Sequence, residues 1–322
     1  MNKDDAPLVS FIIPLYFTGE GIVKLLDAFR SLSLGGDYEL VLVNDGSTDC
    51  TLQRAREIIL TMPVKVTLVD MARNFGEHAA VLEGFRYARG RYVVNLDDDL
   101  QNPIGEAIKL VAHLRETDVD VVYSFYEEKK HHWIRNFGSW LTNRMATFLL
   151  GKPEDLYLSS FRAMKRELVE RIIRYSGPYP YVDGLILGAT NRIGRLQVAH
   201  VGRADGQSGY TMRRLIRLWM NMFFNFSVMP LRVASVLGVL LFGVGLVVLS
   251  VVLVEHFIYG VAQVGWGSLM ATVSIFSGSQ LFILGVLGEY VGRAYMTVSG
   301  KPQSVVREVS AHVPPRPMPA EE

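Results

Sequence analysis

Three consecutive carboxylates, Asp97–Asp99, are the residues of this 322-residue chain whose type and spacing most directly indicate chemistry. They follow Tyr92–Leu96, a short apolar segment typical of a buried β-strand. Adjacent carboxylates repel one another, which raises their pKa values unless a cation lies between them. A Mg²⁺ or Mn²⁺ ion bridging carboxylates and a diphosphate removes this conflict. Solvated loop acids are the alternative, and the position at the end of a strand favours the metal site.

Two further polar clusters lie at the ends of predicted strands. Pro14 and Tyr16 close the first strand, and Asp45 and Asp49 follow the second. Open α/β sheets bind ligands at the carboxyl ends of their strands, so these groups are expected in one site. The two aspartates suit hydrogen bonds from a base or a ribose. In the alternative interpretation, Ser47 or Asp49 caps the next helix.

The elements that position these clusters alternate between strand and helix over the first 125 residues. The predicted strands are Val9–Pro14, Glu39–Val43, Val64–Val69, Tyr92–Leu96 and Val119–Tyr123. The predicted helices are Gly21–Leu32, Thr48–Ile59, Gly76–Ala88 and Pro103–Arg115. Nearly continuous apolar strands indicate a sheet covered on both faces. The alternation predicts a mainly parallel α/β sheet.

Charge and cysteine content exclude several classes of protein. The chain has 33 basic and 32 acidic residues, so a globally basic nucleic-acid-binding surface is not expected. A single cysteine, Cys50, rules out an intrachain disulfide and a cysteine-based zinc cluster. The polar segment Met1–Pro7 lacks the apolar core of a signal peptide. We therefore expect the N-terminal domain to stay on the side of synthesis.

Two long segments, Val233–Val254 and Val264–Gly288, contain no charged residue. Each exceeds the roughly 20 residues that cross a hydrocarbon core about 30 Å thick. The short turn Glu255–Gln263 between them predicts a transmembrane helical hairpin, with a buried hairpin in a soluble protein as the alternative. Lys and Arg are absent from the turn and present outside both segments, which places both ends of the hairpin in the cytoplasm.

Two other segments mix aromatic, apolar and basic residues. Glu127–Gly151 is expected to form amphipathic helices, packed either on the sheet or at the membrane surface. Thr211–Val228 carries three arginines before a cluster of Met and Phe residues, which is typical of a juxtamembrane helix. The resulting division of the chain is 1–210 for the catalytic domain with its amphipathic segment at 127–150, 211–230 for the juxtamembrane helix, 231–290 for the hairpin, and 291–322 for a proline-rich, partly disordered tail.

Several motifs together resemble the inverting family 2 glycosyltransferases. They are Asp45-Gly46-Ser47-x-Asp49, Arg73-Asn74-x-Gly76, and Leu96-Asp97-x-Asp99-Leu100-Gln101-x-Pro103. The chain is most similar to the polyprenyl-phosphate subgroup, which includes dolichyl-phosphate mannose synthase, bacterial glucosyl transferases acting on undecaprenyl phosphate, and the aminoarabinose transferase of lipid A modification. The resemblance extends from Val9 to Arg293 and includes Gly288-Glu289-Tyr290-x-Gly292-Arg293. It implies a GT-A fold and a nucleotide-diphosphate sugar donor, with a UDP-sugar favoured.

The clusters and the resemblance together assign the donor site. The predicted nucleotide-sugar ligands are Pro14, Tyr16, Asp45, Asp97, Asp98, Arg203 and Ser208. Asp99, with Gln101, is expected to hold Mg²⁺ or Mn²⁺ on the diphosphate. Asp98 stands where many family members carry Ala. Gly209 stands where the family's phosphate-clamping loop carries Lys.

The resemblance also assigns the acceptor site. Arg135, Arg144 and Arg162 match basic positions of the family, and a guanidinium fork suits a lipid phosphate. Asp155 is the candidate catalytic base, seven residues before Arg162, which is one more than in typical members. A phosphate monoester has a second pKa of about 6 and is already anionic. We therefore expect Asp155 to orient or desolvate the nucleophile rather than to deprotonate it.

The predicted reaction is an inverting transfer of a sugar to polyprenyl (undecaprenyl) phosphate at the cytoplasmic face of a bacterial inner membrane. The lipid-linked product would supply cell-envelope glycan or lipopolysaccharide modification. A processive polysaccharide synthase is one alternative, but such enzymes usually carry a Gln-x-x-Arg-Trp motif and more spans. A non-enzymatic nucleotide-binding scaffold is another, and the intact acidic clusters argue against it. Glycines in both spans permit close helix contacts within one hairpin or in a homo-oligomer.

Overall fold

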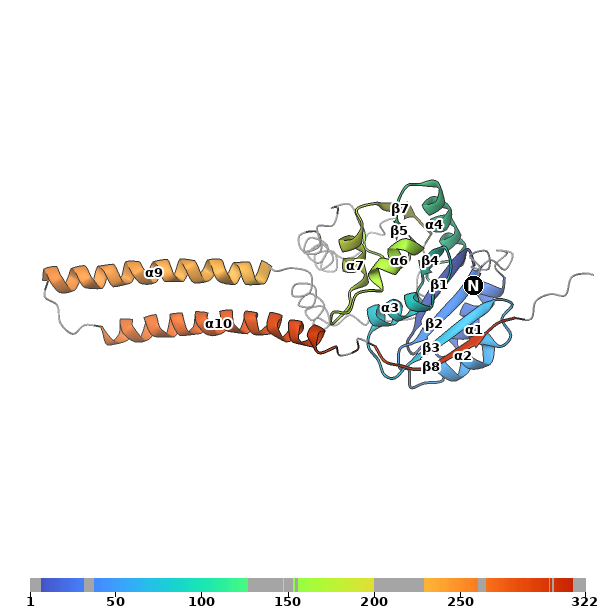
Figure 1. Ribbon diagram of the computed structural model, residues 1–322, viewed down its shortest axis with the longest axis horizontal. Coiled ribbons are helices and arrows are strands. Elements are labelled where there is room, and N and C mark those ends of the chain that lie inside the picture. The colour runs from blue at the N-terminus through green and yellow to red at the C-terminus, as the bar shows by residue number, and fades with distance from the viewer. Residues whose placement is uncertain are drawn as a thin grey trace, which may run out of the picture. The chain divides into compact units, whose positions relative to one another are not determined.

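The computed structural model describes residues 7–31, 38–126, 147, 153, 156–199, 229–259, 265–300, 302 and 304–314 (Figure 1). The chain divides into two compact units. One comprises Met1–Thr211 together with Pro302–Glu322, and the other comprises Met212–Lys301. The first unit holds the sheet and the second holds the two long helices.

The described part of the first unit is built on one eight-stranded sheet of order β7-β5-β6-β4-β1-β2-β3-β8. Its strands are β1 (Val9–Leu15), β2 (Tyr38–Asn44), β3 (Lys65–Met71), β4 (Tyr92–Asn95), β5 (Val121–Phe125), β6 (Arg162–Lys165), β7 (Ile193–Gln197) and β8 (Val306–His312). The four central strands β4-β1-β2-β3 are parallel, as is the pair β5-β7. β6 and β8 run antiparallel to their neighbours. The predicted mainly parallel sheet is confirmed.

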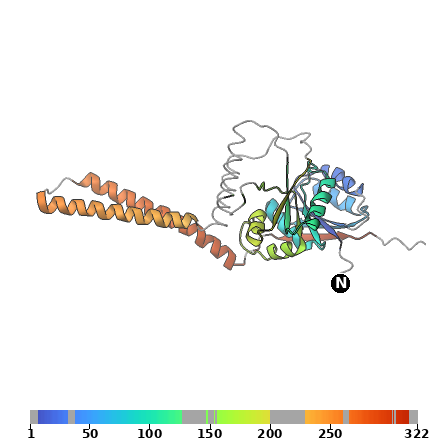
Figure 2. The same ribbon diagram turned by 90° about the horizontal axis from the view of Figure 1, so that it is seen from above.

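Helices cover both faces of the sheet. Those described in this unit are α1 (Gly21–Arg30), α2 (Thr51–Ile59), α3 (Glu77–Tyr87), α4 (Ile104–Glu116), α6 (Arg166–Ile172) and α7 (Val182–Ala189). Residues of α1, α2 and α4 pack in one apolar cluster, and residues of α3, α6 and α7 pack in the other. Figure 2 shows the blue α1 and α2 and the yellow-green α6 and α7 on opposite sides of the sheet. Along β1, Phe11 and Ile13 face the first cluster and Ile12 faces the second, as the two-residue period of a strand requires.

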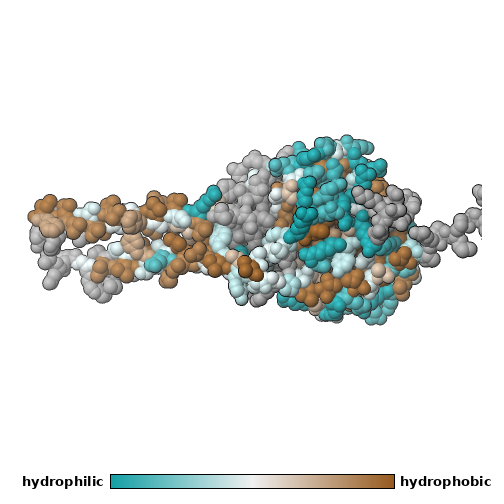
Figure 3. Space-filling model, in the orientation of Figure 1, coloured by the Kyte–Doolittle hydropathy of each residue, from teal (hydrophilic) through white to brown (hydrophobic). Residues whose placement is uncertain are grey.

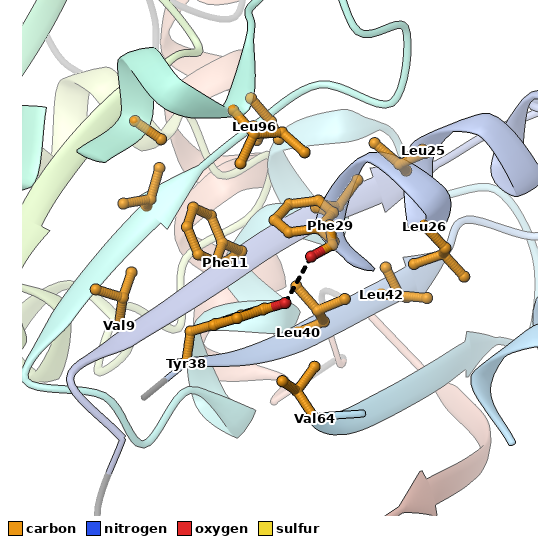
Figure 4. Packing of buried hydrophobic residues seen from close by; sticks show 14 of the residues in the cluster. Val9, Phe11, Leu25, Leu26, Phe29, Tyr38, Leu40, Leu42, Val64 and Leu96 are labelled. Atoms are coloured by element: carbon orange, nitrogen blue, oxygen red, sulfur yellow. Dashed lines mark hydrogen bonds between the residues drawn. The ribbon is translucent and has the colours of Figure 1, made fainter. Parts of the chain in front are cut away.

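Three aromatic rings fix α1 against the first two strands (Figure 4). The Phe11 and Phe29 ring centroids are 5.0 Å apart, and those of Phe11 and Tyr38 are 5.8 Å apart, both edge to face. The buried Tyr38 hydroxyl donates to the Phe29 carbonyl at 2.8 Å, so its polar group is satisfied. This packing anchors β1 and β2, and with them the loops at their carboxyl ends.

Strand β8 was not among the elements predicted from sequence. The proline-rich tail was expected to begin at residue 291, but helix structure continues to Val298 and Val306–His312 then pairs antiparallel with β3. Pro302 precedes the strand, and the cluster of prolines from Pro314 to Pro319 follows it. β8 pairs with backbone groups of β3 that would otherwise form an open sheet edge. The C-terminal segment is therefore part of the same sheet as the N-terminal strands.

The second unit contains α9 (Met229–Tyr259) and α10 (Trp266–Val298). Among the described residues, Met229–Val251 and Ile275–Val298 are apolar and long enough to cross a membrane, and at most 6% of either segment is buried. Figure 3 shows apolar surface along both helices. Val239 and Leu281 are 71% and 70% exposed. So much exposed apolar surface is unfavourable in water, which supports the two helices as candidate membrane spans and argues against a hairpin buried in a soluble protein.

Glycines bring these two helices together. A Cβ atom at Gly245 would lie 2.8 Å from the Phe276 Cζ atom, and one at Gly238 would lie 3.4 Å from the Ile283 Cδ1 atom. The two glycines are seven residues apart, which places them on one face of α9. Small residues at such contacts let helix backbones approach closely in lipid. These two positions therefore serve contacts within one hairpin.

Candidate active site

The acidic run lies at the carboxyl end of β4, where its side chains reach different neighbours. Asp97 accepts a hydrogen bond from the Ser160 hydroxyl at 2.6 Å, which ties it to the segment before β6. Asp98 accepts one from the Thr18 hydroxyl, in the loop after β1. Asp99 is exposed, whereas Asp97 and Asp98 are partly buried. The run thus joins the loops of three neighbouring strands.

Burial raises the pKa of Asp98, and the charges of Asp99 and Asp97 raise it further. Hydrogen bonds from the Thr18 hydroxyl and the Tyr16 backbone N–H act in the opposite direction. From sequence alone, repulsion between adjacent carboxylates is the expected cause of a raised pKa. The structure shows that desolvation is the larger cause at Asp98. A cation near this carboxylate favours its ionised form.

The donor atoms here suit a hard divalent cation. Asp99 Oδ1 accepts the Gln101 backbone N–H at 3.1 Å, and Leu100 between them has a φ of +55°. This tight turn brings the oxygen-bearing residues Asp99 and Gln101 together directly after Asp97 and Asp98 in the chain. Across the described residues, no group of three or more His, Cys, Asp or Glu side chains is placed to hold a metal ion. Mg²⁺ is usually held by one or two carboxylates together with substrate phosphates, so these residues fit a cation shared with a diphosphate.

Asp45 joins the loops that follow β2 and β3. Asp45 is only 2% exposed. Its two carboxylate oxygens accept hydrogen bonds from the backbone N–H groups of Phe75 at 2.7 Å and Gly76 at 2.9 Å. Burial raises the pKa of Asp45, and these two hydrogen bonds oppose the shift. The carboxylate therefore organises the loop at residues 73–76. A contact between Asp45 and the nucleoside stays a prediction.

Gly46 is required where these two loops meet. Its φ is +66°, and a Cβ atom at this position would lie 2.4 Å from both the Arg73 carbonyl carbon and the Asn74 nitrogen. Only glycine avoids both the strained backbone and the clash. The motifs around Asp45 and Arg73, separate in sequence, are thus in backbone contact.

Exposed aromatic rings stand beside the acidic run. Tyr16 and Phe17 are each 51% exposed, and their rings pack edge to face with centroids 4.6 Å apart. Phe17 has a φ of +54°, and its backbone N–H donates to the Ser47 hydroxyl oxygen at 3.2 Å. A bulky residue in this region is strained, and such strain clusters at functional sites. The rings offer flat apolar faces of the kind that stack on bases. Pro14, also predicted here, lies partly buried within β1.

Arg162 is not placed as the acceptor assignment expected. The residue is 2% exposed, and its guanidinium forms an ion pair with Asp183. The Tyr123 hydroxyl donates to the same carboxylate at 3.0 Å, and its ring centroid lies 5.7 Å from the guanidinium carbon. β6 lies inside the sheet between β4 and β5, so its first side chain is enclosed. In this arrangement Arg162 is enclosed beside Asp183 and Tyr123, and its assignment to the acceptor phosphate stays a prediction.

His78 lies close to this buried pair. The pKa of His78 is lowered to about 4, chiefly by burial, with the charge of Asp183 opposing the shift and that of Arg162 adding to it. The His78 and Tyr181 rings meet edge to face, with centroids 4.8 Å apart. The imidazole is therefore neutral at physiological pH, at the start of α3 beside the loop that Asp45 organises.

Comparison with known proteins decides which of the predicted classes applies. Residues 10–173 match the family model described as "Glycosyl transferase family 2". The chain belongs to glycosyl transferase family 2. The predicted GT-A glycosyltransferase class is thereby confirmed.

This glycosyltransferase is similar to curated relatives along most of its length. It is 31% identical to the undecaprenyl-phosphate 4-deoxy-4-formamido-L-arabinose transferase of Aeromonas hydrophila over 313 residues, covering 96% of each chain. It is 33% identical to the transferase of the same name from Pseudomonas aeruginosa, covering 95% of this chain and 91% of the relative. Among solved structures, glucosyl-3-phosphoglycerate synthase from Mycobacterium tuberculosis aligns with a TM-score of 0.49 and 21% identity, over 68% of this chain and 81% of that one.

Several predicted site residues of the glycosyltransferase lie outside the described residues. They are Asp155, Arg135 and Arg144 of the acceptor assignment, and Arg203 and Ser208 of the donor assignment. Their assignments stay predictions.

Two side chains of the site, Thr18 and Ser160, were given no role by sequence reasoning, and they supply hydroxyl donors to the acidic run. Isolated hydroxyl residues in loops carry little sequence signal. Ser160, however, lies two residues before Arg162 in a family motif, which was a usable signal.

Proposed function

We propose that this glycosyltransferase moves one sugar from a nucleotide diphosphate, with UDP favoured, to undecaprenyl phosphate. The observation that carries the proposal is the presence in one chain of two features. One is the edge of the sheet that carries Asp97–Asp99 and Asp45, called the donor edge below, and the other is the pair of unburied apolar helices. The names of the curated relatives add the acceptor and supply 4-deoxy-4-formamido-L-arabinose as the first sugar to test. The product would be a lipid-linked sugar for cell-envelope modification.

The donor edge is suited to a leaving nucleoside diphosphate. Asp99 and Gln101 would hold Mg²⁺ or Mn²⁺, which offsets negative charge on the leaving group when bound. Asp97, which accepts a hydrogen bond from Ser160, would contact the ribose or the sugar. Tyr16 offers its exposed ring to the base.

The chemical step is a single displacement with inversion. A phosphate oxygen of the acceptor attacks the anomeric carbon while the bond from that carbon to the diphosphate oxygen breaks. The nucleoside diphosphate leaves with the electron pair, so no proton transfer is needed for an anionic acceptor. Asp155 would orient that acceptor, Arg135 and Arg144 would bind its phosphate, and Arg203 with Ser208 would bind the donor phosphates.

Chain connectivity supports the proposed topology. Strands β1 to β7 precede the hairpin and β8 follows it, yet all belong to one sheet. Both ends of the hairpin must therefore lie on the same side of the membrane. The distribution of Lys and Arg favours the cytoplasmic side. These observations support a multi-pass protein of the bacterial inner membrane with a cytoplasmic active site.

The test is a transfer assay with the full chain in lipid nanodiscs, Mn²⁺, undecaprenyl phosphate and a panel of UDP- and GDP-sugars that includes UDP-4-deoxy-4-formamido-L-arabinose. Mass spectrometry of the lipid should show one added sugar. Asp99→Asn should abolish the product. Asp27→Asn, which changes an exposed carboxylate of α1 paired with Arg30, is the matched control and should not.

The alternatives give different results in the same assay. Several sugars on one lipid would favour a processive synthase. Nucleotide binding with no lipid product across the panel would favour a non-enzymatic scaffold and would count against the proposal.

A further inference from the structure

The strand that follows the membrane hairpin contacts the loop that follows β3. In β8, Arg307 donates from Nη2 to the Ala72 carbonyl at 2.7 Å and from Nη1 to the Asp70 carboxylate at 3.2 Å. The Ala72 backbone N–H donates to the Val305 carbonyl at 2.8 Å. Both backbone polar groups of Ala72 are therefore held by the C-terminal segment. Ala72 directly precedes the Arg73-Asn74-x-Gly76 motif.

The same contacts continue towards the donor edge. Asp70 is 2% exposed, and its other carboxylate oxygen accepts the Asn44 side-chain N–H at 2.7 Å. Asn44 is 1% exposed and directly precedes Asp45, whose carboxylate holds the backbone N–H groups of Phe75 and Gly76. The loop is thus fixed at residue 72 by Arg307 and at residues 75 and 76 by Asp45. Asp70 connects the two supports.

We propose that Arg307 is a positioning residue for nucleotide-sugar binding. It acts through the loop at residues 72–76 and has no contact with the reacting atoms. The inference rests on the proposed function, because it takes the loop beside Asp45 as part of the donor site. Removing the guanidinium leaves the buried Asp70 carboxylate without its cation and frees the Ala72 carbonyl. The loop then samples other positions, and donor affinity falls.

The neighbouring residue supplies a matched control. Side chains alternate along a strand, and Glu308 points away from Arg307 to pair with Arg56 of α2 at 2.5 Å. Its side chain is 53% exposed. Glu308→Ala therefore removes one tie between β8 and the rest of the unit without touching the loop. If β8 matters only as structural support, Glu308→Ala and Arg307→Ala should behave alike.

The experiment measures KM for the donor, kcat, and UDP affinity by calorimetry with Mn²⁺. Arg307→Ala should raise KM and the Kd of UDP about tenfold, the low end of what a hydrogen bond to a charged group contributes. Its kcat should change less than about twofold, since an affinity effect shifts KM and leaves kcat in place. Arg307→Lys should recover part of the affinity, because an ammonium reaches one of the two acceptors. Glu308→Ala should match the wild type.

Asp70→Asn tests the pathway through which Arg307 acts. It should weaken UDP binding by itself, and the double variant with Arg307→Ala should lose less than the sum of the two single losses, because both single variants remove the Arg307–Asp70 interaction. Unchanged donor KM and UDP affinity in Arg307→Ala, or an equal loss in Glu308→Ala, would overturn the inference. A wild type that binds UDP but transfers no sugar would refute the proposed function alone, because the calorimetric comparison still decides the role of Arg307. A wild type that binds no nucleotide would refute both.

Discussion

The buried pair of Arg162 and Asp183 offers a decisive test, because motif matching and structure give Arg162 different roles. The motif places it on the acceptor phosphate, whereas the structure encloses it. The perturbations are Arg162→Met, which removes the charge while keeping an extended side chain, and Asp183→Asn, which keeps an acceptor for the Tyr123 hydroxyl. The double variant completes the set.

The expected magnitude follows from the burial of the pair. Removing one partner of a buried ion pair costs about 3–5 kcal/mol, because the remaining charge is left unpaired in a low dielectric. Tyr123 still donates to Asp183 in Arg162→Met, which favours the lower value of about 3 kcal/mol. For a domain of this size that corresponds to a fall in Tm of about 6–12 °C. In the double variant neither charge remains, so its loss should be no larger than that of either single variant.

Circular dichroism during thermal unfolding in detergent measures the stability of all four proteins, and lipid transfer at low temperature gives KM for undecaprenyl phosphate. If Arg162 has only a structural role, the variants should show large, non-additive losses of stability. Variants that remain folded at the assay temperature should keep a KM for undecaprenyl phosphate near the wild-type value. An Arg162→Met variant of wild-type Tm with a raised acceptor KM would refute the reasoning and restore the phosphate assignment.

Three further outcomes are expected. Gly46→Ala should lower stability by about 2–4 kcal/mol and weaken UDP binding, because it adds left-handed backbone strain and a backbone clash. Gly105→Ala, where an added Cβ meets open space, should be neutral or stabilising. The pKa of His78 falls from 6.5 to about 4 on folding, so the contribution of His78 to stability should be constant above pH 7 and should be lost as the pH falls from 6.5 to 4. This loss should reach about 3 kcal/mol at most, and His78→Gln should make the fall in Tm over this pH range smaller. Because burial and like charges raise the pKa of Asp98, Asp98→Asn should raise Tm at pH 7 in EDTA, and a variant less stable than the wild type would contradict this.

The first half of the fold could be predicted because its signals are local. Apolar runs such as Phe11–Ile13 and Leu40–Val43 are buried on both faces and bounded by polar turns, so strands β1 to β4 were placed to within two residues. β7 and β8 could not be placed in this way. Ile193–Gln197 and Val306–His312 are partly exposed and mix polar with apolar residues, so only long-range pairing with β5 and β3 makes them strands.

The candidate site divides in a similar way. The apolar segment before Asp97–Asp99 predicted that this run follows a parallel strand, and its place at the carboxyl end of β4 is confirmed. A motif gives the type of a residue but not its surroundings. Whether Arg162 is buried depends on β6 entering the sheet between β4 and β5, and on Asp183 in α7. The enclosure of Asp45 likewise depends on a loop 30 residues away.

The place of β8 also sets an order of events during synthesis. Arg307 and Asp70 are separated by 237 positions, and both spans lie between them. The last strand therefore leaves the ribosome only after the hairpin is made, and pairing over such a separation is slow. Until then the edge of β3 stays open and the loop at residues 72–76 lacks one of its two supports. Completion of the sheet thus follows synthesis of the two long helices, so a chain arrested before they are complete lacks β8 and its contacts with Asp70 and Ala72.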